Sequence, residues 1–310
     1  MIDSFYRNLD EFLRPGDLVI LNDTRVLKSR VFTTLSDGRG RELVVLEKHG
    51  EERQKVLYRG KLHEGDVLRV RGADAEVKVE KIFGNGIAEV RAFLVLKDSE
   101  GEVSGGIELA RLAEEAGTVP LPPYLHREAT EVDVERYQTV FAQEAGSAAA
   151  PTASLNMTEQ LIQKLLDKGV KIEYLTLHVG LGTFLPIRTE EVEKHEMHSE
   201  WFSIPASTLE AIKRTKENGG RVVAVGTTVA RTLEFYAKTG KTSGEDNIFI
   251  YPGFEFELVD VLLTNFHAPK STVLMLAAAF AGWEKLHEAY KHAVTEKYNF
   301  LSYGDSMLII

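Results

Sequence analysis

The sequence predicts an α/β fold in which a main α/β domain carries an inserted small β-barrel domain. Residues 158–251 alternate helical with strand-like segments, which is typical of layered α/β architectures. Residues 24–96 instead hold short strand-like runs, and the glycine-bearing turns between them indicate a small closed or partly closed barrel. We therefore expect the main domain at 1–26 and 98–310 and the barrel domain at 27–97.

The predicted barrel consists of short alternating strands. Turns such as Asp37-Gly38 and Gly84-Asn85-Gly86 separate them. The strands are expected at 31–34, 42–46, 55–58, 67–70, 75–82 and 87–93. A helix over 107–116 and a proline-rich loop over 120–124 follow the last strand.

The main domain is predicted from longer elements. An amphipathic helix opens at Thr158 and ends at Gly169. Further along the chain we expect strands at 170–178, 221–225 and 249–251 and helices at 205–218 and 229–237.

Composition narrows the class of protein. Apolar residues make up 44% and charged residues 27% of the chain, which fits a soluble globular protein. The lack of cysteine in the sequence excludes disulfides, cysteine-ligated zinc and thiol nucleophiles. No signal-like segment opens the chain and no apolar run reaches about 18 residues, so we expect a cytoplasmic protein without membrane contact. The formal charge of −10 argues against indiscriminate nucleic-acid binding but allows a local basic face.

The densest group of polar residues lies between an apolar strand and an apolar helix over 262–276. Pro269 cannot sit inside a central strand, so this group belongs to a turn at a strand's carboxyl end, where open α/β sheets bind ligands. The alternative is a plain loop in which Ser271 or Thr272 caps the helix. A phosphate-binding loop is excluded because Pro269 stands where that motif needs glycine. The polar residues of the turn are Asn265, His267, Lys270 and Ser271.

Four further polar breaks share this pattern. They lie at 136–153, 177–184, 195–200 and 224–231. Each one alone is explained by a turn or a helix cap, and the histidines and glutamates of 195–200 are explained by metal ligation or by a surface capping cluster. Five such breaks in one chain favour a single shared site, for which we expect no metal.

The motifs in these breaks form an ordered series. They are Leu-Pro-Pro-Tyr at 121–124, Glu-Arg-Tyr-Gln-Thr-Val at 135–140, Ala-Ala-Pro-Thr-Ala at 149–153, Thr-Leu-His-Val-Gly-Leu-Gly-Thr-Phe at 176–184, His-x-Met-His-x-Glu at 195–200, Val-Gly-Thr-Thr at 225–228, Thr-Asn-Phe-His at 264–267, Pro-Lys-Ser-Thr at 269–272 and Tyr-Gly-Asp-x-Met-Leu at 303–308. Together with the opening segment 13–26, the series resembles the S-adenosylmethionine:tRNA ribosyltransferase-isomerase family over nearly the whole chain.

This resemblance implies a fold, an activity and partners. Members of the family combine an α/β domain with an inserted β-barrel. They move the ribosyl part of S-adenosylmethionine onto 7-aminomethyl-7-deazaguanine at the tRNA wobble position, giving epoxyqueuosine and releasing adenine and methionine. S-adenosylmethionine is a co-substrate, and no other cofactor is implied. The expected partners are therefore S-adenosylmethionine and the tRNA anticodon loop, and we expect a monomer.

The resemblance also implies which residues carry the chemistry. Removing the ribose C5′ proton needs a base, and a histidine near neutral pKa suits that role. The catalytic candidates are His178, His198, Glu200, His267 and Asp305. The substrate-binding candidates are Arg136, Tyr137, Gln138, Thr139, Pro151, Thr152, Gly180, Gly182, Thr183, Phe184, Gly226, Thr227, Thr228, Arg231, Asn265, Lys270 and Ser271. The residues expected to form a positive face for tRNA are Arg25, Lys28, Arg30, Arg136, Arg231 and Lys270.

Several departures from the family pattern bear on the function. Asn156 stands where the family usually has histidine, and Leu185 and Asn299 stand where it has arginine. The family's first thirty or so residues have no counterpart here. These departures remove polar groups from the expected site. The alternative function is therefore a diverged non-catalytic or altered-substrate relative that binds RNA or a nucleoside.

Overall fold

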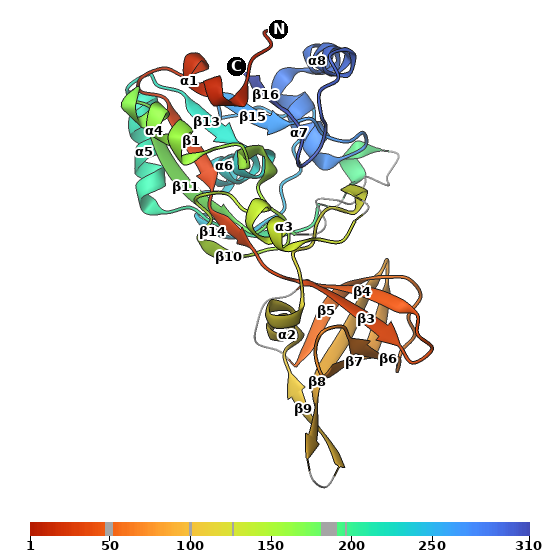
Figure 1. Cartoon of the computed structure of the whole chain (residues 1–310). Helices are drawn as coiled ribbons and strands as arrows, with labels where there is room; N and C mark the ends of the chain where they lie inside the picture. The colour runs from red at the N-terminus through yellow and green to blue at the C-terminus, as the bar shows by residue number, and fades with distance from the viewer. Residues whose placement is uncertain (47–51, 99–100, 126, 181–190, 196) are drawn as a thin grey trace. The chain divides into compact units, whose positions relative to one another are not determined.

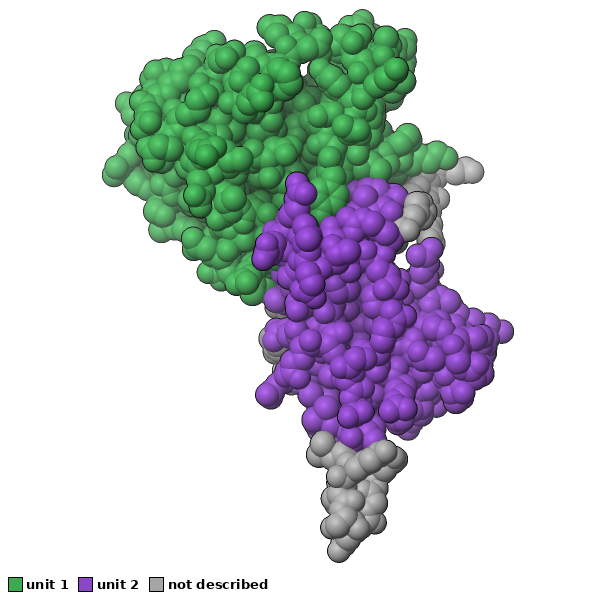
Figure 2. All heavy atoms as spheres, in the orientation of Figure 1, with its two compact units in different colours: residues 1–25, 138–310 green, residues 26–137 purple. Residues whose placement is uncertain are grey.

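The chain forms two compact units, which are coloured separately in Figure 2. Unit 1 consists of residues 1–25 and 138–310, and unit 2 consists of residues 26–137. Each unit has a seven-stranded sheet of its own. The computed structural model describes residues 1–46, 52–98, 101–125, 127–180, 191–195 and 197–310.

The sheet of unit 1 has the strand order β14-β12-β11-β1-β13-β15-β16 (Figure 1). Its middle strands run parallel and are β11 (Lys171–Leu177), β1 (Leu18–Asn22), β13 (Val222–Val225) and β15 (Val261–Asn265). The flanking strands run antiparallel and are β12 (Glu200–Ser203), β14 (Ser243–Asp246) and β16 (Ser306–Ile309). Every residue of β1, β13 and β15 is buried, which fits parallel strands covered on both faces.

Helices cover both faces of this sheet. Leu18 and Ile20 of β1 join a core with residues of α5, α6 and α7, whereas Val19 and Leu21 join a core with residues of α1 and α4. Successive side chains of a strand point to opposite faces, so one short apolar run supplies both layers. The helices are α1 (Leu9–Phe12), α4 (Glu159–Asp167), α5 (Ala206–Glu217), α6 (Thr227–Thr239), α7 (Thr272–Ala281) and α8 (Trp283–Thr295), with short 3-10 turns η1 (Tyr6–Asn8), η3 (Thr152–Ser154) and η5 (Val192–Lys194).

Side-chain caps set the starts of two helices that matter for the site. Thr158 Oγ1 accepts from the Leu161 backbone N–H at 3.2 Å and starts α4. Ser271 Oγ accepts from the Leu274 backbone N–H at 3.2 Å and starts α7. Ser271 therefore caps helix α7, which was one of the two alternatives that the sequence analysis gave for this turn.

The sheet of unit 2 has the strand order β5-β4-β3-β6-β7-β8-β9. β5 also pairs with β8, from Arg53↔Arg91 to Leu57↔Ile87, so β5, β4, β3, β6, β7 and β8 form a ring. Leu109 and Leu112 of α2 pack into the core inside this sheet. The strands are β3 (Arg30–Leu35), β4 (Gly40–Val45), β5 (Arg53–Arg59), β6 (Val67–Val70), β7 (Ala75–Gly84), β8 (Ile87–Asp98) and β9 (Gly101–Ile107), followed by α2 (Leu109–Ala116), η2 (Pro123–Leu125) and α3 (Glu131–Arg136).

A separate two-stranded ladder joins β2 (Thr24–Val26) to β10 (Glu144–Ser147). No helix among the described residues is both long and apolar enough to cross a bilayer.

The mixed α/β class predicted from the sequence is confirmed. The barrel and its boundaries at 27–97 stay predictions. The strand predicted at 249–251 is wrong, because this segment pairs with no described strand and is held by side-chain packing. Ile250 lies in the core of unit 1, and the rings of Phe249 and Tyr251 lie 5.3 Å apart. The helix predicted from residue 107 begins at Leu109, since Ile107 still belongs to β9.

Candidate active site

The carboxyl ends of the parallel strands in unit 1 lie along one edge of its sheet. The chain changes direction across the sheet at β1, because β11 lies on one side of it and β13 on the other. Open α/β sheets bind ligands at such switch points, just outside the carboxyl ends of the strands. The residues at or directly after these ends are Asn22, His178, Gly226 and Asn265.

His178 is held at the end of β11 by two neighbours. Its Nδ1 lies 2.8 Å from Thr24 Oγ1, and its ring stacks on Trp201 with centroids 5.0 Å apart and an interplanar angle of 17°. Asn22 places Thr24, because its Oδ1 accepts from the Thr24 and Leu177 backbone N–H groups at 3.1 and 3.0 Å. Asn22 therefore ties the ends of β1 and β11 together, and the imidazole of His178 takes a defined orientation.

Glu200 lies at the centre of a buried charge network. Its Oε1 accepts from the Gly180 backbone N–H at 2.7 Å and lies 3.3 Å from His198 Nε2. Its Oε2 pairs with the guanidinium of Arg231, whose Nε donates to Asp246 Oδ2 at 3.1 Å. The side chains of Glu200, Arg231 and Asp246 are all buried. One cation is therefore shared between two carboxylates away from water.

This network sets the charges of its members. Burial alone would raise the pKa of Glu200, but the Arg231 charge and the hydrogen bond from His198 lower it to about 2. Burial raises the pKa of Asp246, and Arg231 offsets this only in part. Glu200 is thus the ionised partner of Arg231. The guanidinium is neutralised inside the protein and holds Glu200 in place, instead of presenting a free charge to an anion.

Asn265, the last residue of β15, joins segments that are distant in the chain. Its Oδ1 accepts from Thr152 Oγ1 at 2.9 Å, and its Nδ2 donates to the Asp305 carbonyl and to Ser306 Oγ at 3.4 and 3.3 Å. The carboxylate of Asp305 accepts from the Asn299 backbone N–H at 2.7 Å. Thr152 and Asp305 thus meet at the end of β15, and the Asp305 carboxylate closes a local loop.

His267 lies in the turn that joins β15 to α7. Its Nε2 lies 2.8 Å from Thr264 Oγ1, and its backbone N–H donates to the Tyr290 hydroxyl at 2.7 Å. Burial lowers the pKa of His267 to about 4, below the near-neutral value expected of a base, so the imidazole is neutral near pH 7 and is a weaker base than an ordinary histidine. Lys270 follows on the exposed part of the turn with φ at 58°, a left-handed conformation that costs free energy for residues other than glycine.

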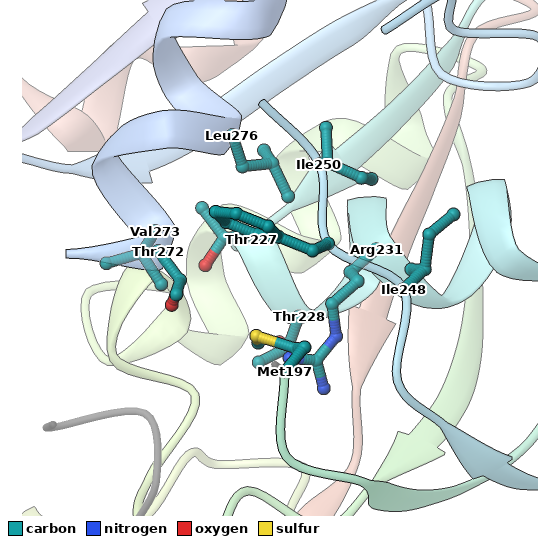
Figure 3. Close-up of a pocket in the computed structure, with 10 residues that line it drawn as sticks. Met197, Thr227, Thr228, Arg231, Ile248, Ile250, Thr272, Val273 and Leu276 are labelled. Carbon is teal, nitrogen blue, oxygen red and sulfur yellow. The ribbon is translucent and has the colours of Figure 1, made fainter. Parts of the chain in front are cut away.

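A pocket lies at the first turns of α6 and α7, which follow the neighbouring strands β13 and β15. Figure 3 shows how side chains of α6, α7 and the segment 248–250 surround it. Its hollow measures about 350 Å³ with space open to solvent included. The lining residues are Thr227, Thr228 and Arg231 of α6, Thr272, Val273 and Leu276 of α7, and Met197, Ile248, Phe249 and Ile250.

Comparisons with known proteins identify the family. The family model described as "Queuosine biosynthesis protein" matches residues 1–309. The chain belongs to this family. It is 53% identical over 316 residues to the S-adenosylmethionine:tRNA ribosyltransferase-isomerase of Pelodictyon phaeoclathratiforme, covering 100% of this chain and 89% of that protein. It is 42% identical over 312 residues to the protein of the same name from Francisella tularensis subsp. tularensis, covering 99% of this chain and 88% of that protein.

A solved structure agrees with this assignment. The crystal structure of the S-adenosylmethionine tRNA ribosyltransferase from Thermotoga maritima matches with a TM-score of 0.50 and 32% identity, covering 98% of this chain and 86% of that chain. The family resemblance deduced from the motifs is therefore confirmed.

The site residues predicted from the sequence fall into separate groups. Glu200 brings Gly180, His198 and Arg231 together, Asn265 contacts Thr152, and Arg231 shares the pocket with Thr227 and Thr228. The contacts described above join the Asp305 carbonyl to Asn265 but do not join the remaining candidates to these groups directly; these candidates are His178, His267, Lys270 and Ser271. Gln138, Thr139, Pro151 and Gly226 belong to unit 1, and Arg136 and Tyr137 belong to unit 2. Gly182, Thr183 and Phe184, with Leu185, lie outside the described residues.

Sequence reasoning missed three polar residues of the site, namely Asn22, Thr24 and Asp246. Asn22 and Thr24 follow the apolar run of β1, so the pattern of a strand ending in a polar break could have found them. Asp246 gave no signal, because its role depends on a contact with Arg231 made only in the folded chain. Within the described part of the chain no cluster of three or more His, Asp or Glu is placed to hold a metal ion, and a metal-free site stays a prediction.

Proposed function

We propose that this protein transfers and isomerises the ribosyl part of S-adenosylmethionine onto 7-aminomethyl-7-deazaguanine at the tRNA wobble position. Adenine and methionine leave, and the product is epoxyqueuosine-tRNA. The observation that carries this proposal is the 53% identity, across all of this chain, to a relative named S-adenosylmethionine:tRNA ribosyltransferase-isomerase. The position of His267 just after the carboxyl end of β15 supports it, since the reaction needs a base there.

His267 is the proposed base. The sulfonium of S-adenosylmethionine acidifies the neighbouring ribose C5′–H, and His267 removes this proton. In that role Nε2–H donates to Thr264 Oγ1, and Nδ1 accepts the proton. His178, oriented by Thr24 and Trp201, is the proposed hydrogen-bond donor to the departing adenine.

The carboxylates have positioning roles in this proposal. Glu200 holds the Gly180 backbone and His198, and Asp305 closes a loop beside Asn265. Removing either carboxylate should therefore act through the placement of its neighbours. Lys270, on the exposed part of the β15–α7 turn, is the proposed contact with tRNA phosphate.

The test is release of free adenine from S-adenosylmethionine in the presence of tRNA that carries the precursor base. Wild type should release adenine together with epoxyqueuosine-tRNA. His267→Asn should abolish release while the protein remains folded. Thr264→Val should lower kcat less than His267→Asn does, because it keeps the imidazole and removes only the hydrogen bond that orients it. Binding of tRNA without adenine release would instead favour the diverged relative that binds RNA or a nucleoside.

The finer features belong to the same proposal. S-adenosylmethionine is the only co-substrate, and the protein acts as a monomer in the cytoplasm on the tRNA anticodon loop. Residues 27–97 form a small barrel domain inserted into a main domain of 1–26 and 98–310. The pairing of β5 with β8 supports this arrangement, because it joins the strands into a ring.

A further inference from the structure

The pocket between α6 and α7 contains hydroxyl groups without partners. Thr227 is 8% exposed and Thr272 is 6% exposed, and both residues line the pocket. Neither hydroxyl makes a hydrogen bond to any of the described residues. Each hydroxyl can therefore donate to a group in the hollow, which favours a ligand with a hydrogen-bond acceptor.

The start of α6 also favours an acceptor with negative charge. Its N-cap is Gly226, which has φ at 98° and no side chain to satisfy the first N–H groups of this 13-residue helix. The free N–H groups and the helix dipole together attract an anion. The side chains of Thr227 and Thr228 extend from this first turn into the pocket (Figure 3).

The remaining wall limits what the anion can be attached to. Ile248, Ile250, Val273 and Leu276 supply the apolar part of the lining. The guanidinium of Arg231 adds no net attraction, because Glu200 and Asp246 already neutralise it. One anionic group on an unbranched apolar stem fits this combination. A phosphate, with a larger charge and no apolar part of its own, leaves the wall unused.

We propose that this pocket binds the methionyl end of S-adenosylmethionine, and after the reaction the methionine product. The carboxylate accepts from the N–H groups at the start of α6 and from the hydroxyls of Thr227 and Thr272. The side-chain carbons lie along the wall of Ile248, Ile250 and Leu276. This assignment rests on the proposed function for its substrate and adds the residues that hold one end of it.

Kinetics with valine variants test the assignment. Thr227→Val and Thr272→Val remove a hydroxyl at nearly constant size. Each should raise the KM for S-adenosylmethionine about 10- to 100-fold, which is the value of one hydrogen bond to a charged group, and kcat should change less than threefold. The thermal midpoint without ligand should stay equal or rise, because no folded-state hydrogen bond is lost. An unchanged KM in both variants would overturn the assignment.

Thr215→Val is the matched control. Thr215 Oγ1 is buried and has no partner among the described residues, but it lies on α5 and does not line the pocket. This change should leave the KM for S-adenosylmethionine as in wild type and should affect the thermal midpoint in the same direction. A KM increase here as large as in Thr227→Val would assign the effect to general loosening and would contradict a specific subsite.

Calorimetry separates the subsite from the reaction. L-Methionine should bind wild type, methioninol should bind at least tenfold more weakly because it lacks the carboxylate, and Thr227→Val should weaken methionine equally. Inorganic phosphate should not displace methionine. Equal affinity for methionine and methioninol, or displacement by phosphate, would overturn the assignment. If methionine binds as expected but wild type releases no adenine, the subsite stands and the proposed reaction fails.

Discussion

Arg231 pairs with Glu200 in the interior of unit 1, although 31 positions separate them in the chain. By sequence Arg231 is a candidate for binding phosphate or a substrate carboxylate. In the folded chain its charge is already balanced by Glu200 and Asp246. The pair therefore anchors β12 to α6 and, through Glu200, fixes the backbone at Gly180.

Arg231→Met should lower the free energy of unfolding by about 3 to 5 kcal/mol, because it leaves two carboxylates buried without a counter-charge. Urea unfolding followed by circular dichroism measures this loss. Lys216→Met is the control: its ammonium pairs with Asp260 at 2.7 Å at a partly exposed site, and its loss should cost about 0 to 1 kcal/mol. An Arg231→Met protein as stable as wild type but unable to bind S-adenosylmethionine would return Arg231 to a ligand-binding role.

The depressed pKa of His267 should make stability depend on pH between about 6.5 and 4. In the folded chain the pKa is about 4, against 6.5 in the unfolded chain. As pH falls below 6.5 the unfolded chain takes up a proton that the folded chain does not, so stability falls until about pH 4 and then levels off. Urea unfolding at pH 7.5, 5.5 and 4.5 should show a smaller loss for His267→Asn than for wild type. Parallel losses in the two proteins would contradict the assigned pKa.

Two buried serines should respond in opposite directions to alanine. Ser154 Oγ has no partner among the described residues, so Ser154→Ala should raise the free energy of unfolding by about 1 kcal/mol. Ser147 Oγ accepts from the Val179 backbone N–H at 2.9 Å, so Ser147→Ala should lower it by about 1 to 3 kcal/mol. Urea unfolding measures both. Loss of S-adenosylmethionine affinity in a stabilised Ser154→Ala would show that this hydroxyl serves a ligand.

Replacing Lys270 with glycine should raise the stability of the protein and weaken its binding to tRNA. Lys270→Gly relieves the left-handed backbone and should stabilise the protein by about 1 kcal/mol. It should also weaken tRNA binding and reduce the slope of log affinity against log salt by about 1, as expected for one lost phosphate contact. Lys270→Met is the control that removes the charge and keeps the strain. Filter binding at several salt concentrations decides: an unchanged slope in both variants means that Lys270 does not contact phosphate.

The sequence was informative where burial is continuous. The apolar runs of β13 and β15 predicted strands because a parallel strand covered on both faces needs apolar residues throughout. β12 and β14 were missed, since short polar segments become strands only by pairing with neighbours. At 249–251 a strand was predicted that does not form. The apolar residues there pack into the core of unit 1 without pairing with a described strand.

For the candidate site, too, features that depend on neighbouring residues were predictable, and features that depend on distant contacts were not. Ser271 was recognisable as a cap because caps are local, three residues from the group that they bind. The neutralisation of Arg231 on α6 was not predictable, because its partners come from two separate strands, β12 and β14. Likewise, the stacking of His178 on Trp201 depends on the pairing of β11 with β12, which no local pattern encodes.

The central position of β1 has a consequence for how the protein is made. Asn22 bonds to Leu177, 155 positions later, and among the described strands β1 pairs with β11 and β13. At about 5 to 20 residues per second, the ribosome needs roughly 8 to 30 seconds to supply the first of them. The strands of unit 2 pair with one another and can close during that interval. We expect nascent chains arrested near residue 175, before β11 leaves the ribosome, to resist protease within 26–137 and to be cut within 1–25. During each round of synthesis the apolar segment Leu18-Val19-Ile20-Leu21 is therefore exposed to solvent until its partner strands are made. A chaperone that binds it during this period would protect it from aggregation.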